Sequence, residues 1–66
     1  MTDRELIRRL RRQGCEGVRQ SGSHMVVRCG HCQSVVPRHA GRDLGTGLLR
    51  AIERDLEPCL GRKWLR

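Results

Sequence analysis

The spacing of the apolar residues changes twice along the chain, and this change limits the folds that the chain can adopt. At the N-terminal end, Leu6, Ile7 and Leu10 form one narrow apolar stripe at helical spacing. The segment Thr2–Glu5 matches a capping box, and Gly14 follows the last periodic residue as a stop signal. The sequence therefore predicts a first helix between these two signals, with arginines on the face opposite the stripe.

The middle of the chain is prone to β-structure. We expect short strands at 15–20, 24–29 and 33–37, because the helical spacing is lost there and valines dominate the second and third segments. Ser21–Ser23 is a turn cluster. Gly30–His31 lies between two β-prone runs, which predicts a hairpin with a type II′ turn.

A helical pattern returns near the C-terminal end. Residues 38–47 are expected to form a loop, and Thr46 is a plausible cap for a second helix. We expect Pro58 to end this helix and Cys59–Arg66 to add a short turn. The apolar residues of this region that should reach the core are Leu48, Leu49, Ile52, Leu56, Leu60, Trp64 and Leu65.

These elements predict an α+β fold in the order α-β-β-β-α. A chain of 66 residues can bury only one thin core, so we predict a single domain, 1–66, and exclude Rossmann sheets and TIM barrels. The expected arrangement is a three-stranded antiparallel sheet with two helices on one face, like a double-stranded-RNA-binding domain in outline. The other face of the sheet would be open.

The charge of the chain indicates a polyanionic partner. Lys and Arg number 14 against 7 Asp and Glu, a net charge of +7, and every basic residue except Lys63 is arginine. RNA or DNA is the leading candidate, because arginine favours bidentate phosphate contacts. The alternative is that a GC-rich coding genome favours arginine and that the charge only serves solubility, which would explain arginine in place of lysine but not the excess of basic over acidic residues. Phe and Tyr are absent, which excludes a sheet that stacks bases on aromatic rings.

The first residues of the chain indicate the cellular compartment of the protein, and the compartment determines the expected state of the cysteines. Asp3, Arg4 and Glu5 interrupt any apolar start, so we expect no signal peptide and a cytoplasmic protein. Without a signal peptide, the four cysteines are expected to be free thiols or metal ligands rather than a disulfide framework.

The segment Cys29–Cys32, with sequence CGHC, allows three interpretations. Its spacing fits half of a zinc site, and Cys15, His31, His39 and Cys59 are scattered candidates for further ligands. It also matches a dithiol redox motif, which needs a strand leading into a helix. We favour a third interpretation, in which the two cysteines are only neighbours across the hairpin turn, and we expect no metal and no cofactor.

A candidate catalytic group follows the first predicted turn. His24 comes directly after Gly22 and Ser23, and an imidazole there can exchange a proton near neutral pH. Gly22 lets a phosphate approach the backbone, and the Ser23 hydroxyl can donate to phosphate oxygens. The alternative is that His24 is an ordinary polar residue of a half-exposed strand.

A second basic cluster, Arg38 and His39, follows Pro37 at the end of the third predicted strand. His39 could act as general acid to His24 as base. A phosphate contact, or a loop histidine without a role, explains the same residues equally well.

Several segments together resemble the HicA toxins, also called YcfA-like mRNA interferases. The segments are RQSGSH at Arg19–His24, VPRH at Val36–His39 and GTGLLRAIERDL at Gly45–Leu56, and the resemblance covers residues 3–57. It implies a fold like that of double-stranded-RNA-binding domains, ribosome-independent cleavage of mRNA and neutralisation by a HicB-type antitoxin. The catalytic histidine of the family matches His24, and its glycine and serine match Gly22 and Ser23.

Two features depart from the family pattern. Cys15 stands where the family commonly has a bulky aromatic residue, and the Cys29 and Cys32 pair is not part of the pattern.

We therefore predict a metal-independent endoribonuclease toxin of a type II toxin–antitoxin pair, with single-stranded mRNA as substrate. His24 is the expected general base on the ribose 2′-hydroxyl. The alternatives are a non-catalytic RNA-binding module of the same fold and a small zinc-dependent nucleic-acid-binding domain. The residues expected to bind RNA or support the reaction are Arg8, Arg12, Arg19, Gly22, Ser23, Arg38 and His39.

Overall fold

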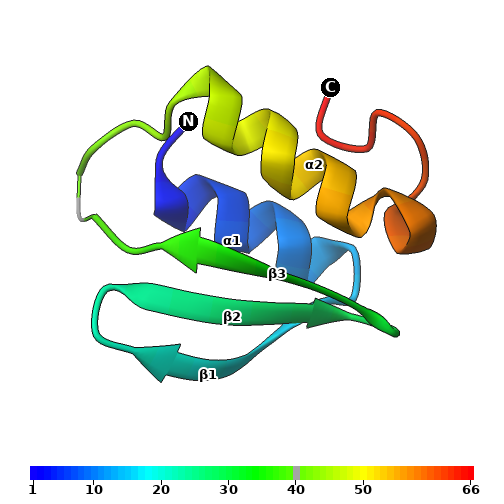
Figure 1. Cartoon of the computed structure of the whole chain (residues 1–66), viewed down its shortest axis with the longest axis horizontal. Coiled ribbons are helices and arrows are strands. Elements are labelled where there is room, and N and C mark those ends of the chain that lie inside the picture. Colours follow the sequence, from blue (N-terminus) through cyan, green and yellow to red (C-terminus); the bar gives the residue numbers. More distant parts are fainter. Residues whose placement is uncertain (40) are drawn as a thin grey trace.

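The computed structural model describes residues 1–39 and 41–66, and it confirms the predicted order of elements. Ala40, within the expected loop 38–47, lies outside the described residues. The helices and strands are α1 (Asp3–Arg12), β1 (Glu16–Ser21), β2 (His24–Cys29), β3 (Cys32–Pro37) and α2 (Thr46–Leu60). The strands form one antiparallel sheet in the order β1-β2-β3, with both helices packed beside it (Figure 1).

Helix α1 begins and ends at its predicted signals. The backbone N–H of Glu5 donates to Thr2 Oγ1 at 3.2 Å, and the backbone N–H of Thr2 donates to Glu5 Oε1 at 3.0 Å. This reciprocal pair satisfies two N–H groups that have no partner inside the helix. At the other end, Gly14 adopts a φ of +88°, which glycine reaches without a steric penalty.

Both hairpins close through a two-residue turn with glycine in the first position. Ser21 pairs with His24 around Gly22, and Cys29 pairs with Cys32 around Gly30. The φ angles of the two glycines are +58° and +62°. A positive φ at the first turn residue alone is the type II′ pattern, which was predicted for the second hairpin.

The helices cover β2 and β3 and leave β1 exposed. Val27 and Val36 are buried on the helix side of the sheet, whereas every residue of β1 is exposed. Ser34, also on the helix side, is satisfied by a 2.8 Å hydrogen bond to Asp55 of α2. The apolar core consists of Leu6, Ile7, Leu10, Cys15, Val27, Cys29, Cys32, Val36, Leu44, Ile52, Leu56 and Leu65.

Helix α2 differs from its prediction at both ends. Thr46 is the first helical residue rather than the cap, and Gly45 caps the helix without a side-chain bond. Pro58 does not end the helix, which continues to Leu60. Proline cannot donate the backbone hydrogen bond of an interior position. In the last turn the backbone N–H of Gly61 donates to the carbonyl of Glu57, and Cys59 is bonded to the sheet.

The cysteines correct the expectation of free thiols. Cys15 is bonded to Cys29, and Cys32 to Cys59. Cys29 and Cys32 are indeed partners across the hairpin, but each forms its disulfide with a cysteine from elsewhere in the chain. Disulfides of this kind stabilise small domains by about 2–4 kcal/mol each, chiefly by restricting the unfolded chain.

The C-terminal turn packs on α2 through Glu53. Trp64 Nε1 donates to the backbone carbonyl of Glu53 at 2.8 Å, and the Glu53 carboxylate accepts from the backbone N–H of Leu65 and from Arg66 Nε. The expected contribution of Leu65 and Trp64 to the core is confirmed. In the part of the chain that the structure describes, neither helix is long and apolar enough to cross a membrane.

Candidate nucleic-acid interface

His24 is the first residue of β2 and is exposed to solvent. It follows the turn of Gly22 and Ser23, as the sequence predicts, and pairs across the sheet with Pro37. Because side chains alternate along a strand and Val27 is buried, His24 belongs to the face of the sheet opposite the helices. An imidazole in this position can meet a large ligand such as RNA without any rearrangement of the core.

Arg38 connects the His24 turn to helix α1. Its backbone N–H donates to the carbonyl of Ser23, and its Nε donates to Oδ2 of Asp3 at 2.7 Å. Its Nη1 lies 3.9 Å from the sulfur of Met25. The guanidinium is therefore held between α1 and β2, while the backbone of Arg38 is bonded to the residue that precedes His24.

Asp3 is the acidic partner in this arrangement, and it is buried although it is charged. Its second carboxylate oxygen accepts the backbone N–H of Arg4 at 2.8 Å. The hydrogen bond from Arg38, together with that backbone bond, holds the pKa of Asp3 below its usual range. Asp3 thus remains an anion near neutral pH and keeps Arg38 in place.

A groove lined mainly by arginines runs along α1. Its volume is about 490 Å³, and its lining residues are Arg4, Ile7, Arg8, Arg11, Arg12 and Arg38. A second hollow, of about 430 Å³, shares Arg4 and Arg38 and extends to Gln20 of β1. The guanidinium groups have no acidic partner there except Asp3 among the described residues, so the groove is suited to a polyanion.

The predicted RNA-contacting residues fall into two groups. The structure places Arg8, Arg12 and Arg38 together in the arginine groove. Arg19 lies elsewhere, against Val18, Val26 and Gln33 in a shallow hollow of the sheet. Arg19 pairs with Val26, two residues from His24 on β2, so it shares the open face with His24.

His39 is not brought into contact with His24. Its side chain is exposed, and its backbone carbonyl accepts the N–H of Arg42 at 3.0 Å. No hydrogen bond joins the two imidazoles in the described parts of the chain. The role of His39 as general acid therefore stays a prediction.

Sequence reasoning missed the residues that position Arg38. The sequence places Asp3 in the capping-box segment and Met25 in a β-prone run, but it does not indicate that both contact Arg38. Asp3 and Arg38 lie 35 residues apart, and no spacing rule relates them. Arg4 and Arg11 belong to the arginine face that the sequence predicts for the first helix, and the structure places both in the groove.

Comparison with known proteins gives a family for this fold and site. The family model described as "HicA toxin of bacterial toxin-antitoxin" matches residues 4–57. This chain belongs to the HicA toxin family. It matched no curated protein and no solved structure in the corresponding comparisons.

Membership of the HicA family establishes that the chain is of the toxin type in toxin–antitoxin pairs. The matched segment contains α1 from its second residue, the sheet and most of α2, and with them Arg38 and His24. The C-terminal turn around Trp64 lies beyond the matched segment.

Proposed function

We propose that this chain is an endoribonuclease that cleaves single-stranded mRNA inside the cell, with His24 as general base. The observation that carries this proposal is the junction at Arg38. Arg38 lines the arginine groove, and its backbone N–H bonds to the residue that precedes His24. A phosphate backbone lying in the groove is thereby directed to the turn that bears an exposed imidazole.

The reaction proposed at His24 is an internal transesterification. The neutral imidazole accepts the proton of a ribose 2′-hydroxyl, and the 2′-oxygen forms a bond to the adjacent phosphorus. The bond from phosphorus to the 5′-oxygen breaks, and the leaving oxygen takes up a proton from a general acid or water. The products carry 2′,3′-cyclic phosphate and 5′-hydroxyl ends, and the chemistry requires no metal ion.

The groove and the open sheet face have different roles in this proposal. Arg8, Arg12 and Arg38 bind phosphates on one side of the Gly22 turn. Arg19 binds a phosphate on the sheet face that also carries His24. Gly22 and Ser23 let the scissile phosphate approach the backbone between them. A flexible single strand can follow this path around the edge of the sheet, whereas a duplex resists the in-line geometry.

The proposed inhibitor is an acidic antitoxin of the HicB type. A chain of net charge +7 with an exposed reactive group requires a partner that covers the group. We expect the antitoxin to contact His24 and the arginines of α1, and to associate faster at low ionic strength. A complex that leaves His24 open to RNA would contradict inhibition by occlusion.

The test of the proposed function is cleavage of a defined RNA by the His24→Ala variant. General acid–base catalysis by one group contributes about 10²–10⁴-fold, so the variant should lose at least that factor while RNA affinity is retained. His31→Ala is the matched control, because His31 is an exposed histidine in the turn that follows β2, at the end of the strand opposite to His24. Cleavage by the wild type should continue in EDTA.

Two results would exclude the proposed cleavage mechanism and leave the non-catalytic RNA-binding module as the interpretation. One is full activity of His24→Ala. The other is cleavage of a substrate with 2′-deoxyribose at the scissile position, because that sugar lacks the attacking oxygen. A bell-shaped dependence on pH would support a second catalytic group such as His39, whereas a plateau at high pH would argue against it.

A further inference from the structure

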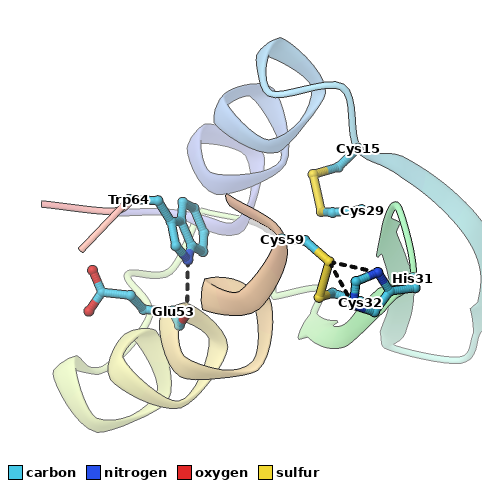
Figure 2. The surroundings of a disulfide bond; sticks show 7 residues. All are labelled: Cys15, Cys29, His31, Cys32, Glu53, Cys59 and Trp64. Atoms are coloured by element: carbon cyan, nitrogen blue, oxygen red, sulfur yellow. Dashed lines mark hydrogen bonds between the residues drawn. A yellow bond between two sulfur atoms is a disulfide. The ribbon is translucent and has the colours of Figure 1, made fainter. Parts of the chain in front are cut away.

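All four cysteines of the chain meet at one end of the sheet. Cys29 and Cys32 are direct partners across the β2–β3 turn, and each is bonded to a cysteine that another element supplies (Figure 2). Cys15 comes from the α1–β1 junction and Cys59 from the last turn of α2. Because Cys29 and Cys32 face each other across the turn, the two disulfides start from the same end and the same face of the sheet.

His31 lies against this cluster from the turn itself. Its Nδ1 and Nε2 atoms are 3.6 and 3.7 Å from Cys59 Sγ. The ligand atoms of His31, Cys32 and Cys59 all lie within 4.8 Å of one another. Figure 2 shows the ring of His31 directed at the Cys32–Cys59 bond.

The cluster is remote from the proposed reaction centre. Cys29 is the last residue of β2 and His24 the first. Five steps of about 3.4 Å place the two α-carbons roughly 17 Å apart. No step at His24 uses the cysteines, and the family pattern does not include the Cys29 and Cys32 pair.

We propose that the four cysteines, once reduced, form a structural zinc site with four thiolate ligands. Two cysteines on either side of a two-residue hairpin turn, joined by two from other elements, is a common arrangement for such sites. Zn–S bonds of about 2.3 Å in a tetrahedron set the sulfurs about 3.8 Å apart. The group of ligand atoms that lie within 4.8 Å of one another contains Cys32 and Cys59 but not Cys15 or Cys29. The site therefore forms when both disulfides are reduced and the side chains of Cys15 and Cys29 rotate toward Cys32 and Cys59.

Burial favours a closed structural site over a catalytic one. Cys15, Cys29 and Cys32 are each at most 6% exposed, and Cys59 is half-buried. Structural zinc sites are four-coordinate and shielded, whereas catalytic sites keep one position open to water. His31, which is exposed, stands beside Cys59 as an N–H donor to its thiolate rather than as a ligand.

Formation of the zinc site requires a reductant that breaks both disulfides. Each cysteine sulfur then binds zinc instead of another sulfur. A dithiol reductant transfers two electrons and two protons to each disulfide and becomes a cyclic disulfide itself. The four resulting thiols lose four protons when they bind one Zn²⁺. The expectation that the thiols are reduced in the cell rests on the proposed function, because mRNA is met in a compartment that keeps thiols reduced. The capacity to bind zinc does not depend on it.

Zinc would replace the disulfides as the link between elements. In either form, the α1–β1 junction, the hairpin and the end of α2 are joined at one point. A core with few large side chains gains stability from such a link, and metal binding contributes directly to folding.

The test uses the full chain, reduced with a dithiol under anaerobic conditions and titrated with Co²⁺ and then Zn²⁺. We expect one equivalent of Co²⁺ to give the intense visible absorption of a tetrahedral site together with thiolate charge-transfer bands, and Zn²⁺ to abolish both. We also expect zinc to protect all four thiols from alkylation and to raise the thermal midpoint of the reduced chain. Absence of these signals from fully reduced protein would overturn the proposal.

Variants identify the ligands. Cys15→Ser and Cys59→Ser should each lose the tetrahedral cobalt spectrum, and His31→Ala should keep it. Loss of the spectrum in His31→Ala with retention in Cys15→Ser would refute the ligand set of four thiolates. His24→Ala should bind cobalt like the wild type, so failure of the proposed nuclease activity is distinguishable from failure of the zinc site.

Discussion

Arg38 Nε donates a 2.7 Å hydrogen bond to Oδ2 of Asp3, which joins the end of β3 to the first turn of α1. The Asp3 side chain is buried, at 4% exposed, and the Arg38 side chain is 31% exposed. The anion is therefore hidden while part of the cation faces solvent. In this pair the Asp3 carboxylate holds the Arg38 guanidinium in place, and the guanidinium can still bind a phosphate.

The first prediction separates the charge of Arg38 from its geometry. Arg38→Lys keeps the charge but lacks the fork that reaches Asp3 and Met25 together. We expect KM for RNA to rise several-fold with kcat nearly unchanged, because His24 remains in place. Steady-state cleavage of a fluorescent RNA measures both constants.

The control for this prediction is Arg62→Lys, an exposed arginine outside the arginine groove. It should leave both constants unchanged. A fall in kcat alone for Arg38→Lys would contradict a positioning role in binding and would place Arg38 in the chemical step.

The second prediction concerns stability in acid. The hydrogen bond from Arg38 holds the pKa of Asp3 low in the folded state. A carboxyl with a lower pKa folded than unfolded stabilises the fold above the unfolded value, about 3.9, and this stability is lost as pH falls through the folded value. Asp3→Asn should therefore be less stable than the wild type near neutral pH, and the difference should shrink below about pH 4.

Urea unfolding at a series of pH values, with the disulfides intact, measures this difference. Glu5 also has a lowered pKa, because the backbone and side chain of Thr2 donate to it, so Asp3→Asn should keep part of the acid sensitivity. A stability difference that does not change with pH would exclude the Asp3 charge as its source.

Local patterns in the sequence were sufficient to predict most of the fold. The capping box at Thr2 and the glycine turns at Gly22 and Gly30 depend on residues within a few positions of one another. The exposed position of His24 at a strand start follows from the same local pattern. These features could be predicted because neighbouring residues determine them.

Features that join distant segments could not be predicted in this way. Four cysteines allow three pairings, and only the packing of α2 on the sheet brings Cys59 to Cys32. The same disulfide joins the helical turn around Pro58 to the sheet, a contact that the local sequence at Pro58 does not indicate. Arg19 was grouped with Arg38 as a phosphate-binding residue, but the sheet separates their side chains.

The third prediction uses Gly17 in β1, where the sheet register shifts before Arg19. A Cβ at Gly17 would lie 2.9 Å from the sulfur of Met25, which in turn contacts Arg38. Gly17→Ala should force Met25 aside and cost about 1 kcal/mol of unfolding free energy, at the low end for overpacking because methionine is flexible. It should also raise KM for RNA through Arg38.

Gly47→Ala is the matched control, since a Cβ there meets nothing within 4 Å and the residue lies in α2. Alanine in place of a helical glycine should stabilise the fold by up to about 1 kcal/mol. Both variants replace glycine with alanine. If the unfolding free energy falls in Gly17→Ala and rises in Gly47→Ala, the difference is due to the contact with Met25. Equal effects would contradict this contact.

The fourth prediction concerns the path of the RNA. Arg8 lies in the arginine groove and Arg19 on the open sheet face with His24. For single strands, the slope of log affinity against log salt is about −0.7 per neutralised phosphate. If the strand follows both surfaces, Arg8→Ala and Arg19→Ala should each flatten the slope by about that amount, and the double variant by about twice as much. Fluorescence anisotropy with an uncleavable 2′-deoxy substrate measures the slopes.

The comparison of the two single variants decides which surface leads to His24. A strand that follows the groove alone would give a flatter slope for Arg8→Ala and a wild-type slope for Arg19→Ala. A strand confined to the sheet face would give the reverse. Only a path around the Gly22 turn predicts that both variants change the salt slope equally and that the two changes add. On this path the two arginines bind different phosphates of one RNA strand. They have no contact through which their effects could couple.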